Sequence, residues 1–236
     1  MILRCLAHVH THFSFDSRLT AKRILARARQ HSIDILIVTD HNTVNGSLEL
    51  ARLARGNPRF VIVAGEFQTE KGDIIGLFLR NEITSRSAQE VTRQIKAQGG
   101  LVLLPHPYKA HRLDDALLAE VDLIETFNAR CSAKQNAEAE RLAIRLNKAA
   151  LAGCDAHCGP ELNAVVNEFE AAKAETEDDL RHVLLCAARS FHSRSVSRIY
   201  QPYSQMIKAY KTKDIRLFLY QAKRVLSHVA RARRER

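Results

Sequence analysis

Two short runs of metal-ligand residues stand far apart in the sequence: His8-Val9-His10 and Asp155-Ala156-His157. On an extended strand, positions i and i+2 point to the same face, so each run would present two ligands together. Two such pairs meeting at one end of a sheet would place four nitrogen or oxygen ligands in one pocket. Imidazole and carboxylate ligands suit Zn, Mn or Fe ions. The two runs therefore predict a metal site.

Further residues of the same kinds follow other apolar runs. His41, Glu66 and His106 each come directly after such a run, and Asp16 and Asp73 are additional carboxylates. The carboxyl ends of strands are where α/β sheets and barrels carry their active sites. These candidates exceed what one tetrahedral ion needs, so we expect two or three divalent ions. The predicted metal ligands are His8, His10, Asp16, His41, Glu66, Asp73, His106, Asp155 and His157.

Such a cluster would lower the pKa of a bound water, make hydroxide at neutral pH and clamp the oxygens of a phosphate ester. Three basic residues close in sequence to the ligands are candidates for binding substrate phosphate: Arg18, Lys109 and Arg130. Asp40 is expected to orient the adjacent histidine or its loop rather than to bind an ion. Histidines outside the strand ends, His111 among them, are expected at the surface.

Apolar runs alternate with helical stretches over most of the chain. The strand runs are nearly continuous in apolar residues, which is typical of strands buried on both faces. This alternation predicts a parallel sheet with crossover helices, open or closed into a barrel. The predicted strands are Leu3–Val9, Ile33–Thr39, Phe60–Ala64, Ile74–Leu79, Leu101–Leu104, Leu123–Thr126 and Ala150–Gly153, and the predicted helices are Ala21–Gln30, Ser47–Ala54, Ala88–Gln98, Asp114–Glu120 and Ala133–Ala149.

Basic charge is concentrated at the C-terminal end. The chain of 236 residues carries a net charge of +10, but the residues before Arg189 are close to neutral. This shift predicts a domain over residues 1–190 and a basic helical extension over residues 191–236. Apolar residues in Ile215–Val229 recur every three or four positions, as in an amphipathic helix. That helix could dock on the barrel, lie on an anionic membrane surface, or bind nucleic acid or another protein.

The sequence shows no apolar run long enough for a membrane span and no signal-peptide core at its start. Its five cysteines are scattered and odd in number, which favours reduced thiols. We therefore expect a cytoplasmic protein, with peripheral membrane attachment through the extension left open.

Five short motifs together resemble a known family. They resemble, in order and spacing, the motifs of the polymerase and histidinol phosphatase (PHP) domain. The five motifs are His8-Val9-His10-Thr11-x-x-Ser14, Thr39-Asp40-His41-Asn42, Gly65-Glu66, Pro105-His106-Pro107 and Cys154-Asp155-Ala156-His157. The resemblance covers roughly residues 3–190. It implies a distorted (β/α)7 barrel, a trinuclear metal centre at the carboxyl ends of the strands, and hydrolysis of phosphate esters.

The resemblance also implies how the ligands are shared. His8, His10, Glu66 and Asp155 would hold one ion, and Glu66 would bridge to a second ion that His106 also holds. The third ion would be held by Asp16, His41 and His157. The sequence departs from the family pattern at Leu6, where an Asp is frequent, and at Asp73, where a His is frequent. Asp16 stands where some members have His.

These observations favour a metal-dependent phosphoesterase acting on small phosphomonoesters or nucleotides. A nuclease acting on RNA or DNA ends, with the basic extension gripping the substrate, is one alternative. A regulatory module that binds metal without catalysis is another.

Overall fold

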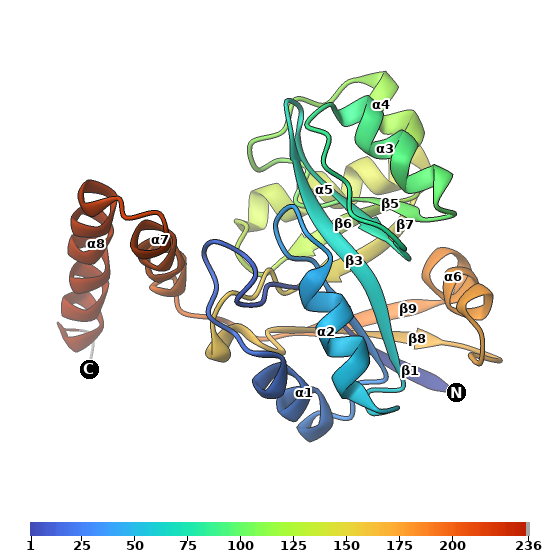
Figure 1. The fold of residues 1–236 in the computed structure, drawn as a ribbon, viewed down its shortest axis with the longest axis horizontal. Helices are drawn as coiled ribbons and strands as arrows, with labels where there is room; N and C mark the ends of the chain where they lie inside the picture. The colour runs from blue at the N-terminus through green and yellow to red at the C-terminus, as the bar shows by residue number, and fades with distance from the viewer. Residues whose placement is uncertain (235–236) are drawn as a thin grey trace.

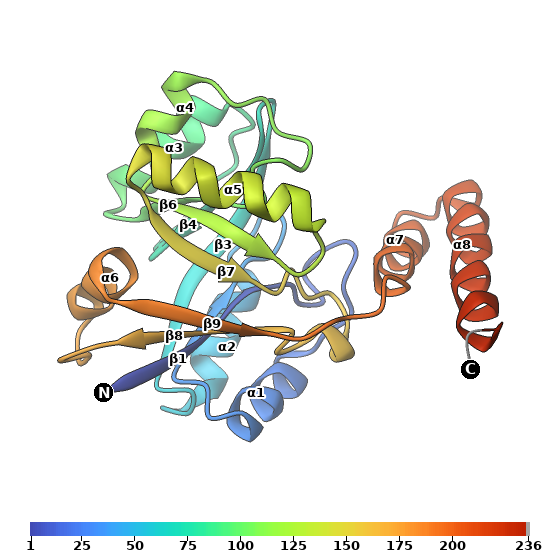
Figure 2. The same ribbon diagram turned by 180° about the vertical axis from the view of Figure 1, so that it is seen from behind.

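Nine strands form one sheet that nearly closes into a barrel (Figures 1 and 2). The computed structural model describes residues 1–234. Along the sheet the strands stand in the order β7-β6-β5-β4-β3-β2-β1-β8-β9. Their bounds are β1 Ile2–Val9, β2 Ile35–Val38, β3 Phe60–Thr69, β4 Gly72–Leu77, β5 Leu101–Leu104, β6 Leu123–Asn128, β7 Ala149–Gly153, β8 Val165–Glu170 and β9 Arg189–Ser193.

The barrel class is confirmed, but the sheet is mixed rather than wholly parallel. β1, β2 and β3 pair in parallel, as do β5, β6 and β7. β3 and β4 form an antiparallel hairpin, because the chain reverses between Thr69 and Gly72, whose φ is +115°. β8 and β9 were not predicted, and both pair antiparallel. β9 gave no apolar signal because its residues are mostly exposed.

The seam of the barrel lies between β7 and β1. Just beyond β7, the Cys154 amide donates to the Ala7 carbonyl at 3.0 Å, and the Ala156 amide donates to His8 at 3.1 Å. Lower in the seam, the carboxamide of Asn167 on β8 accepts from the Ala152 amide at 2.9 Å. The same carboxamide donates to the Ala152 carbonyl at 2.7 Å. The first and seventh strands are therefore joined at their carboxyl ends.

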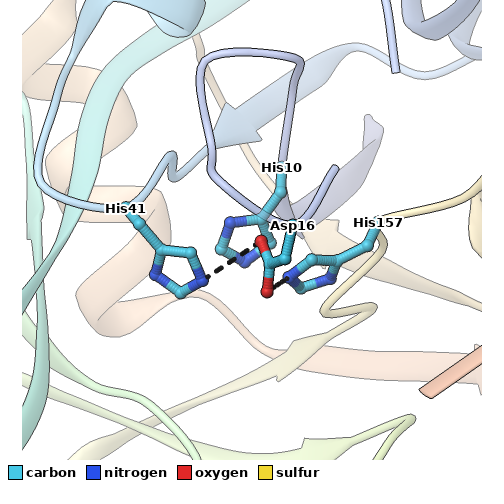
Figure 3. Close-up of side chains that lie close together, drawn as sticks. All are labelled: His10, Asp16, His41 and His157. Carbon is cyan, nitrogen blue, oxygen red and sulfur yellow. Dashed lines mark ion pairs between the residues drawn. The ribbon is translucent and has the colours of Figure 1, made fainter. Parts of the chain in front are cut away.

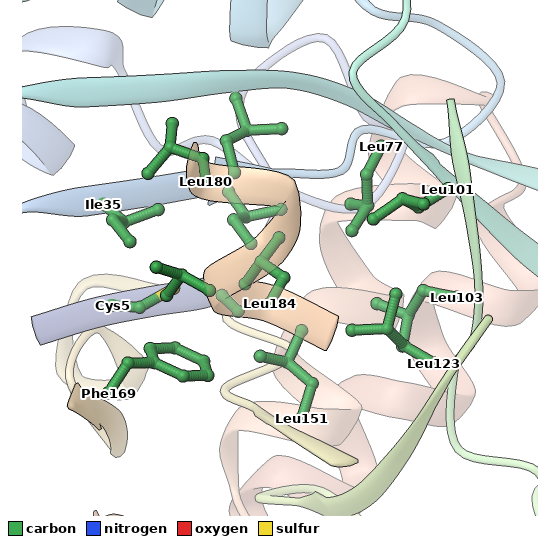
Figure 4. Packing of buried hydrophobic residues seen from close by; sticks show 14 of the residues in the cluster. Cys5, Ile35, Leu77, Leu101, Leu103, Leu123, Leu151, Phe169, Leu180 and Leu184 are labelled. Carbon is green, nitrogen blue, oxygen red and sulfur yellow. The ribbon is translucent and has the colours of Figure 1, made fainter. Parts of the chain in front are cut away.

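Aliphatic side chains fill the inside of the barrel (Figure 4). Alternate residues of β1, such as Cys5 and Ala7, belong to this inner core, while Leu6 packs in a second cluster outside the sheet. Leu180 and Leu184 of α6, Glu177–Cys186, join the inner core. Burial on both faces explains the continuous apolar runs.

Helices cover the outside of the sheet. Their bounds are α1 Ala21–Gln30, α2 Asn45–Ala54, α3 Ala88–Ala97, α4 Asp115–Glu120 and α5 Ala133–Leu146. α1 matches its predicted bounds, and Thr20 caps it by accepting from the Arg23 amide. α5 ends three residues before its predicted end, because Asn147 adopts a left-handed conformation with φ of +49°.

Two helices extend from the barrel, α7 Tyr200–Lys211 and α8 Ile215–Arg234. α8 packs on α7, and α7 lies between α8 and the barrel (Figures 1 and 2). The boundary at residue 190 falls inside β9 and stays a prediction, and residues 235–236 of the predicted extension lie outside the described residues. No helix within residues 1–234 is long and apolar enough to cross a membrane.

Candidate metal centre

Eight of the nine predicted ligands meet at the carboxyl ends of the strands. They form three overlapping groups, and within each group the ligand atoms lie within 4.8 Å of one another. One group lies on the side of the β1–α1 loop and two share His8. The groups are His10, Asp16, His41 and His157; His8, Glu66 and His106; and His8, His10 and Asp155.

The backbone brings these side chains together by leaving the extended conformation. His8 has φ of +59°, and the register of β1 against β2 shifts between Leu6 and Val9. A bulge of this kind re-aims side chains next to a site. His106 and Asp155 also have positive φ, at +29° and +49°. The alternation of an extended strand is therefore not what makes the pairs converge, although the rings of His8 and His10 do lie 5.3 Å apart.

Glu66 and Asp73 occupy neighbouring strands at this edge. Glu66 lies inside β3, which continues to Thr69, rather than after its end. Asp73 is near the start of β4, and because β4 is antiparallel its start lies at the same edge. Burial and the nearby Glu66 raise the pKa of Asp73 to about 6. Its carboxylate is outside the three groups found among residues 1–234.

His8 is held in one tautomer by a carboxylate. Its Nδ1 donates to Glu125 Oε1 at 2.7 Å. Its Nε2 faces the centre, 3.5 Å from Glu66 Oε1 and 3.8 Å from Asp155 Oδ1. Such a carboxylate behind an imidazole is typical of metal-binding histidines, because it fixes the ring and leaves the inner nitrogen free to bind.

Hydrogen bonding fixes His10 in the same way. Ser14 Oγ has a single proton, which it donates to Asp40 Oδ1 at 2.6 Å. His10 Nδ1 lies 3.1 Å from Ser14 Oγ, which has no second proton to give, so His10 Nδ1 must be the donor of this bond. The Nε2 of His10 then carries a lone pair and lies 3.5 Å from Glu66 Oε2 and 3.6 Å from Asp155 Oδ1.

The ring of His157 is also oriented by its outer nitrogen. Its Nδ1 lies 2.9 Å from the carbonyl oxygen of Asp155, which can only accept. Its Nε2 lies 3.1 Å from Asp16 Oδ2, and Figure 3 shows Asp16 between His157 and His41. His41 places Nε2 at 3.6 Å from Asp16 Oδ1 and Nδ1 at 3.1 Å from Glu66 Oε2.

A lone pair that faces a carboxylate oxygen is repelled unless a proton or a cation lies between them. The inner nitrogens of His8, His10 and His157 all face carboxylates in this way, and all three side chains are buried. Within residues 1–234, the Nε2 atoms of His8 and His10 and the Oε2 atom of Glu66 have no hydrogen-bond partner. The donor set therefore fits divalent cations.

The charges of the site point the same way. Burial alone would raise the pKa of Glu66, but His8 and His41 hold it well below its usual range. Burial also lowers the pKa of His8, yet Glu125, Glu66 and Asp155 raise it well above the usual value. Carboxylates buried this deeply need positive charge nearby, whether from protons on the histidines or from metal ions.

Asp40 organises the loop that follows β1. It accepts from the Thr11 amide, the Thr11 hydroxyl and the Ser14 hydroxyl, each at 2.6 Å. A side chain at Gly46 would overlap Asp40, so a glycine is required there. Asp40 thus acts on His10 and on the His41 amide through Ser14 rather than on the His41 ring.

Glu125 is a site residue whose role the sequence did not predict. Besides holding His8, its carboxylate accepts from the His106 amide at 2.8 Å and from Asn128 Nδ2 at 2.9 Å. A side chain at Gly153 would overlap its Oε1. In the sequence, Glu125 is a single acidic residue inside the apolar run of β6. This pattern indicates a buried carboxylate but does not show which residue it contacts.

The three predicted phosphate-binding residues have different surroundings. Lys109 Nζ lies 3.2 Å from Asp155 Oδ2, at the edge of the centre. Arg130 forms two bonds of 2.8 Å with Glu161 and a third, of 3.1 Å, to Ser204 on α7. Arg18 is exposed on the β1–α1 loop.

His111 is half-buried instead of exposed. Its ring packs against His106 with the centroids 5.5 Å apart. Its two nitrogens face the carbonyl oxygens of Lys109 and Asp73, at 3.1 and 2.9 Å. His111 therefore ties the loop after β5 to the start of β4, beside the centre.

The fold and the cluster define an α/β barrel protein with a candidate multinuclear metal centre at the carboxyl ends of its strands. Comparison with known families makes this specific: residues 7–233 match the PHP domain, and the chain belongs to this family.

The chain is also similar to known proteins in sequence and in structure. The uncharacterised protein MJ1587 of Methanocaldococcus jannaschii is 35% identical over 136 residues, which is 52% of this chain and 80% of that protein. A two-domain protein from Bacteroides vulgatus, containing a predicted PHP-like metal-dependent phosphoesterase, has a TM-score of 0.69 at 16% identity. The match covers 82% of this chain and 65% of that one.

The lesion-specific endonuclease EndoQ from Pyrococcus furiosus is also similar in structure. Its TM-score is 0.60 at 16% identity, covering 81% of this chain and 58% of that one. At these identities the structural likeness concerns the fold. The chain spans about two thirds or less of both solved proteins.

Proposed function

We propose that the protein is a metal-dependent phosphoesterase that hydrolyses small phosphomonoesters or nucleotides. The observation that carries this proposal is the set of inner histidine nitrogens aimed at Glu66, Asp155 and Asp16 in one buried cluster. Membership of the PHP family supports it.

The donor set suits two or three Zn, Mn or Fe ions, because it combines neutral imidazoles with carboxylates. When bound, the ions would supply an activated water and would neutralise charge on the phosphate. Glu66 is placed to be shared, since its two oxygens face different histidines: His106 at 3.2 Å and His41 at 3.1 Å.

The chain's own residues provide the rest of the site. Glu125 orients the imidazole of His8 directly, and Asp40 orients that of His10 through Ser14. Lys109 is the cation best placed for a phosphate oxygen, because Asp155 holds its ammonium at the edge of the cluster. Asp155 also keeps the pKa of Lys109 above its usual value, so the ammonium stays charged at neutral pH. Arg130 is already paired with Glu161, so we assign it a supporting role beside the site instead of phosphate binding.

The test is a substrate panel with Mn, Zn and Fe, run on the wild-type protein, His8→Ala and Asp155→Ala. We expect hydrolysis of p-nitrophenyl phosphate that depends on metal and falls at least about 100-fold in both variants. His192→Ala, which removes an exposed histidine on β9, is the matched control.

Other outcomes separate the alternatives. Preference for the bis ester or for nucleic acid ends would favour a nuclease. Stoichiometric metal binding without turnover on any ester would point to a regulatory module. Unchanged rates in both ligand variants would refute the proposed centre.

A further inference from the structure

Asp16 differs from the other candidate ligands in where it is held. It lies in the loop between β1 and α1, seven residues after β1 ends at Val9, while His41 lies three residues after the end of β2 and His157 four residues after the end of β7. On the barrel side the loop is fixed by Ser17, whose hydroxyl lies 2.9 Å from the His10 carbonyl and 3.0 Å from the His157 carbonyl. Together with Asp40, which holds Thr11 and Ser14, this fixes one side of the loop. The position of Asp16 also depends on what holds the outer side.

The outer side is held by a lysine from the C-terminal extension. Lys211, the last residue of α7, donates to the carbonyl oxygens of His12 at 2.8 Å, Ser14 at 2.6 Å and Ser17 at 2.7 Å. An ammonium has three protons, so all of them are used. Two of the three carbonyls precede Asp16 in sequence and the third follows it. Bonds from a charged donor are stronger than neutral ones, which makes this a firm clamp on a short loop.

A second contact from α7 reaches a different ligand. Lys208 lies over the ring of Phe15, with Nζ 4.7 Å from the centroid. The other partner of that ring is His41, stacked nearly parallel with centroids 4.5 Å apart. The Phe15 ring therefore contacts both Lys208 of α7 and His41, while Lys211 bonds to the backbone around Asp16.

α7 is itself attached to the barrel. The hydroxyl of the buried Ser204 accepts from Arg130 Nη1 at 3.1 Å. Arg130 pairs with Glu161, whose Oε2 accepts from the amide of His157 at 2.9 Å. Through these contacts α7 is connected to three of the four residues of the group on this side: Asp16, His41 and His157.

We propose that α7 positions one ion site of the centre, and that Lys211 is the positioning residue that keeps Asp16 in place for the ion shared with His41 and His157. The inference rests on the proposed metal-dependent function. Its consequence is that a residue far outside the ligand motifs sets the occupancy of one ion and not of the others.

The test measures metal binding rather than turnover. Full-length protein is stripped with chelator, dialysed against graded Mn(II), and bound metal per chain is counted by elemental analysis. Lys211→Met keeps the side-chain length and removes the donors. We expect it to bind one ion fewer where the wild type is filled, with the affinity of that ion lowered about 10- to 100-fold. Lys211→Arg, which keeps a charged donor, should recover most of the loss.

Two comparisons make the result specific. Lys223→Met removes an exposed lysine from α8 and should leave the binding curve unchanged. In an Asp16→Asn background, adding Lys211→Met should cause no further loss, because Lys211 is proposed to act through Asp16. If Lys211→Met does not fold, Lys208→Met serves instead, with an expected loss of about two- to fivefold.

The failures are distinguishable. Wild-type protein that binds no metal would refute the proposed function itself. A wild type that binds metal, with Lys211→Met showing the same binding curve, would refute the role of Lys211 and leave the function standing. The role of Lys211 would also be refuted if Lys211→Met lowered the melting temperature without changing metal binding. It would be refuted too if Lys211→Met reduced metal binding as much in the Asp16→Asn background as in the wild type.

Discussion

Single atoms around the cluster decide which way its imidazoles face. Glu125 sets the tautomer of His8, and the one proton of Ser14 sets that of His10. Neither partner belongs to the three candidate ligand groups found among residues 1–234, yet each determines whether an inner nitrogen can bind. At this scale the sequence indicated which side chains lie together, because residue type and strand position carry that information, and eight of the nine candidate ligands do so. It could not identify Glu125 as the partner of His8, because 117 residues separate them.

Replacing Glu125 by Gln should weaken metal binding about 10- to 100-fold without changing the fold. The amide would bring an N–H towards the His106 amide, which now donates to that carboxylate. Gly153→Ala should act alike, because the added methyl would displace Glu125. Metal titration followed by calorimetry measures the effect, with the exposed Glu120→Gln as control. Wild-type affinity in both site variants would contradict the role of Glu125.

After chelation the stability of the protein should depend on pH through His41. Burial lowers its pKa, but Glu66 and Asp16 raise it, so that it changes from its ordinary 6.5 to about 10. The stabilisation is complete below pH 6.5 and is lost as pH rises through about 10, when His41 loses its proton. The melting temperature of chelated wild type should therefore fall over this range more steeply than that of His41→Gln. Parallel curves for the two proteins would exclude this contribution.

The strands and helices that carry the ligands were largely predictable, since their apolar periodicity reflects burial. Less predictable were β8, where Asn167 and Glu168 interrupt the apolar pattern, and β9, whose residues are mostly exposed. The β3–β4 hairpin was also missed, because Gly65 and Glu66 interrupt the apolar run after Ala64 although the strand continues to Thr69. That continuation matters to the site, since it carries Glu66 and returns Asp73 to the same edge.

Asn167 on β8 should be essential for closing the barrel. Asn167→Ala would leave the buried amide and carbonyl of Ala152 without the partner that now satisfies both. Each buried group left unpaired costs on the order of 1–3 kcal/mol, so we expect a loss of about 2–4 kcal/mol in unfolding free energy. Denaturant unfolding measures it, beside the exposed Asn81→Ala. A loss below about 1 kcal/mol would show that the seam does not depend on this side chain.

On the scale of the whole molecule, α8 carries exposed apolar and basic side chains and is separated from the candidate metal centre by α7. α8 exposes Leu219 and Leu226, with fractional exposures of 62% and 68%, and Arg216 and Lys223 are exposed on the same helix. Apolar residues beside basic ones suit an anionic lipid surface. Sequence composition could indicate this separation but not the packing of α8 on α7, since that depends on which face meets the partner helix.

We therefore expect the protein to bind vesicles containing phosphatidylserine, with binding weakened by salt. Replacing Leu219 and Leu226 by Gln should reduce binding severalfold, because the buried apolar area drives insertion. Vesicle sedimentation measures it, and Ile144→Gln, an exposed apolar residue on α5, is the control. Binding to RNA that is unaffected by the Leu substitutions, with none to vesicles, would contradict the lipid prediction.

The seam between β7 and β1 gives the metal ions a second consequence. One ligand pair lies at the end of the first strand and the other follows the seventh. Ions shared between the pairs would therefore tie together points separated by most of the barrel's sequence. A tie that closes so long a loop removes much conformational freedom from the unfolded chain. The ions would then act as a reversible cross-link. Losing them would separate β1 from β7 before any other pair of neighbouring strands.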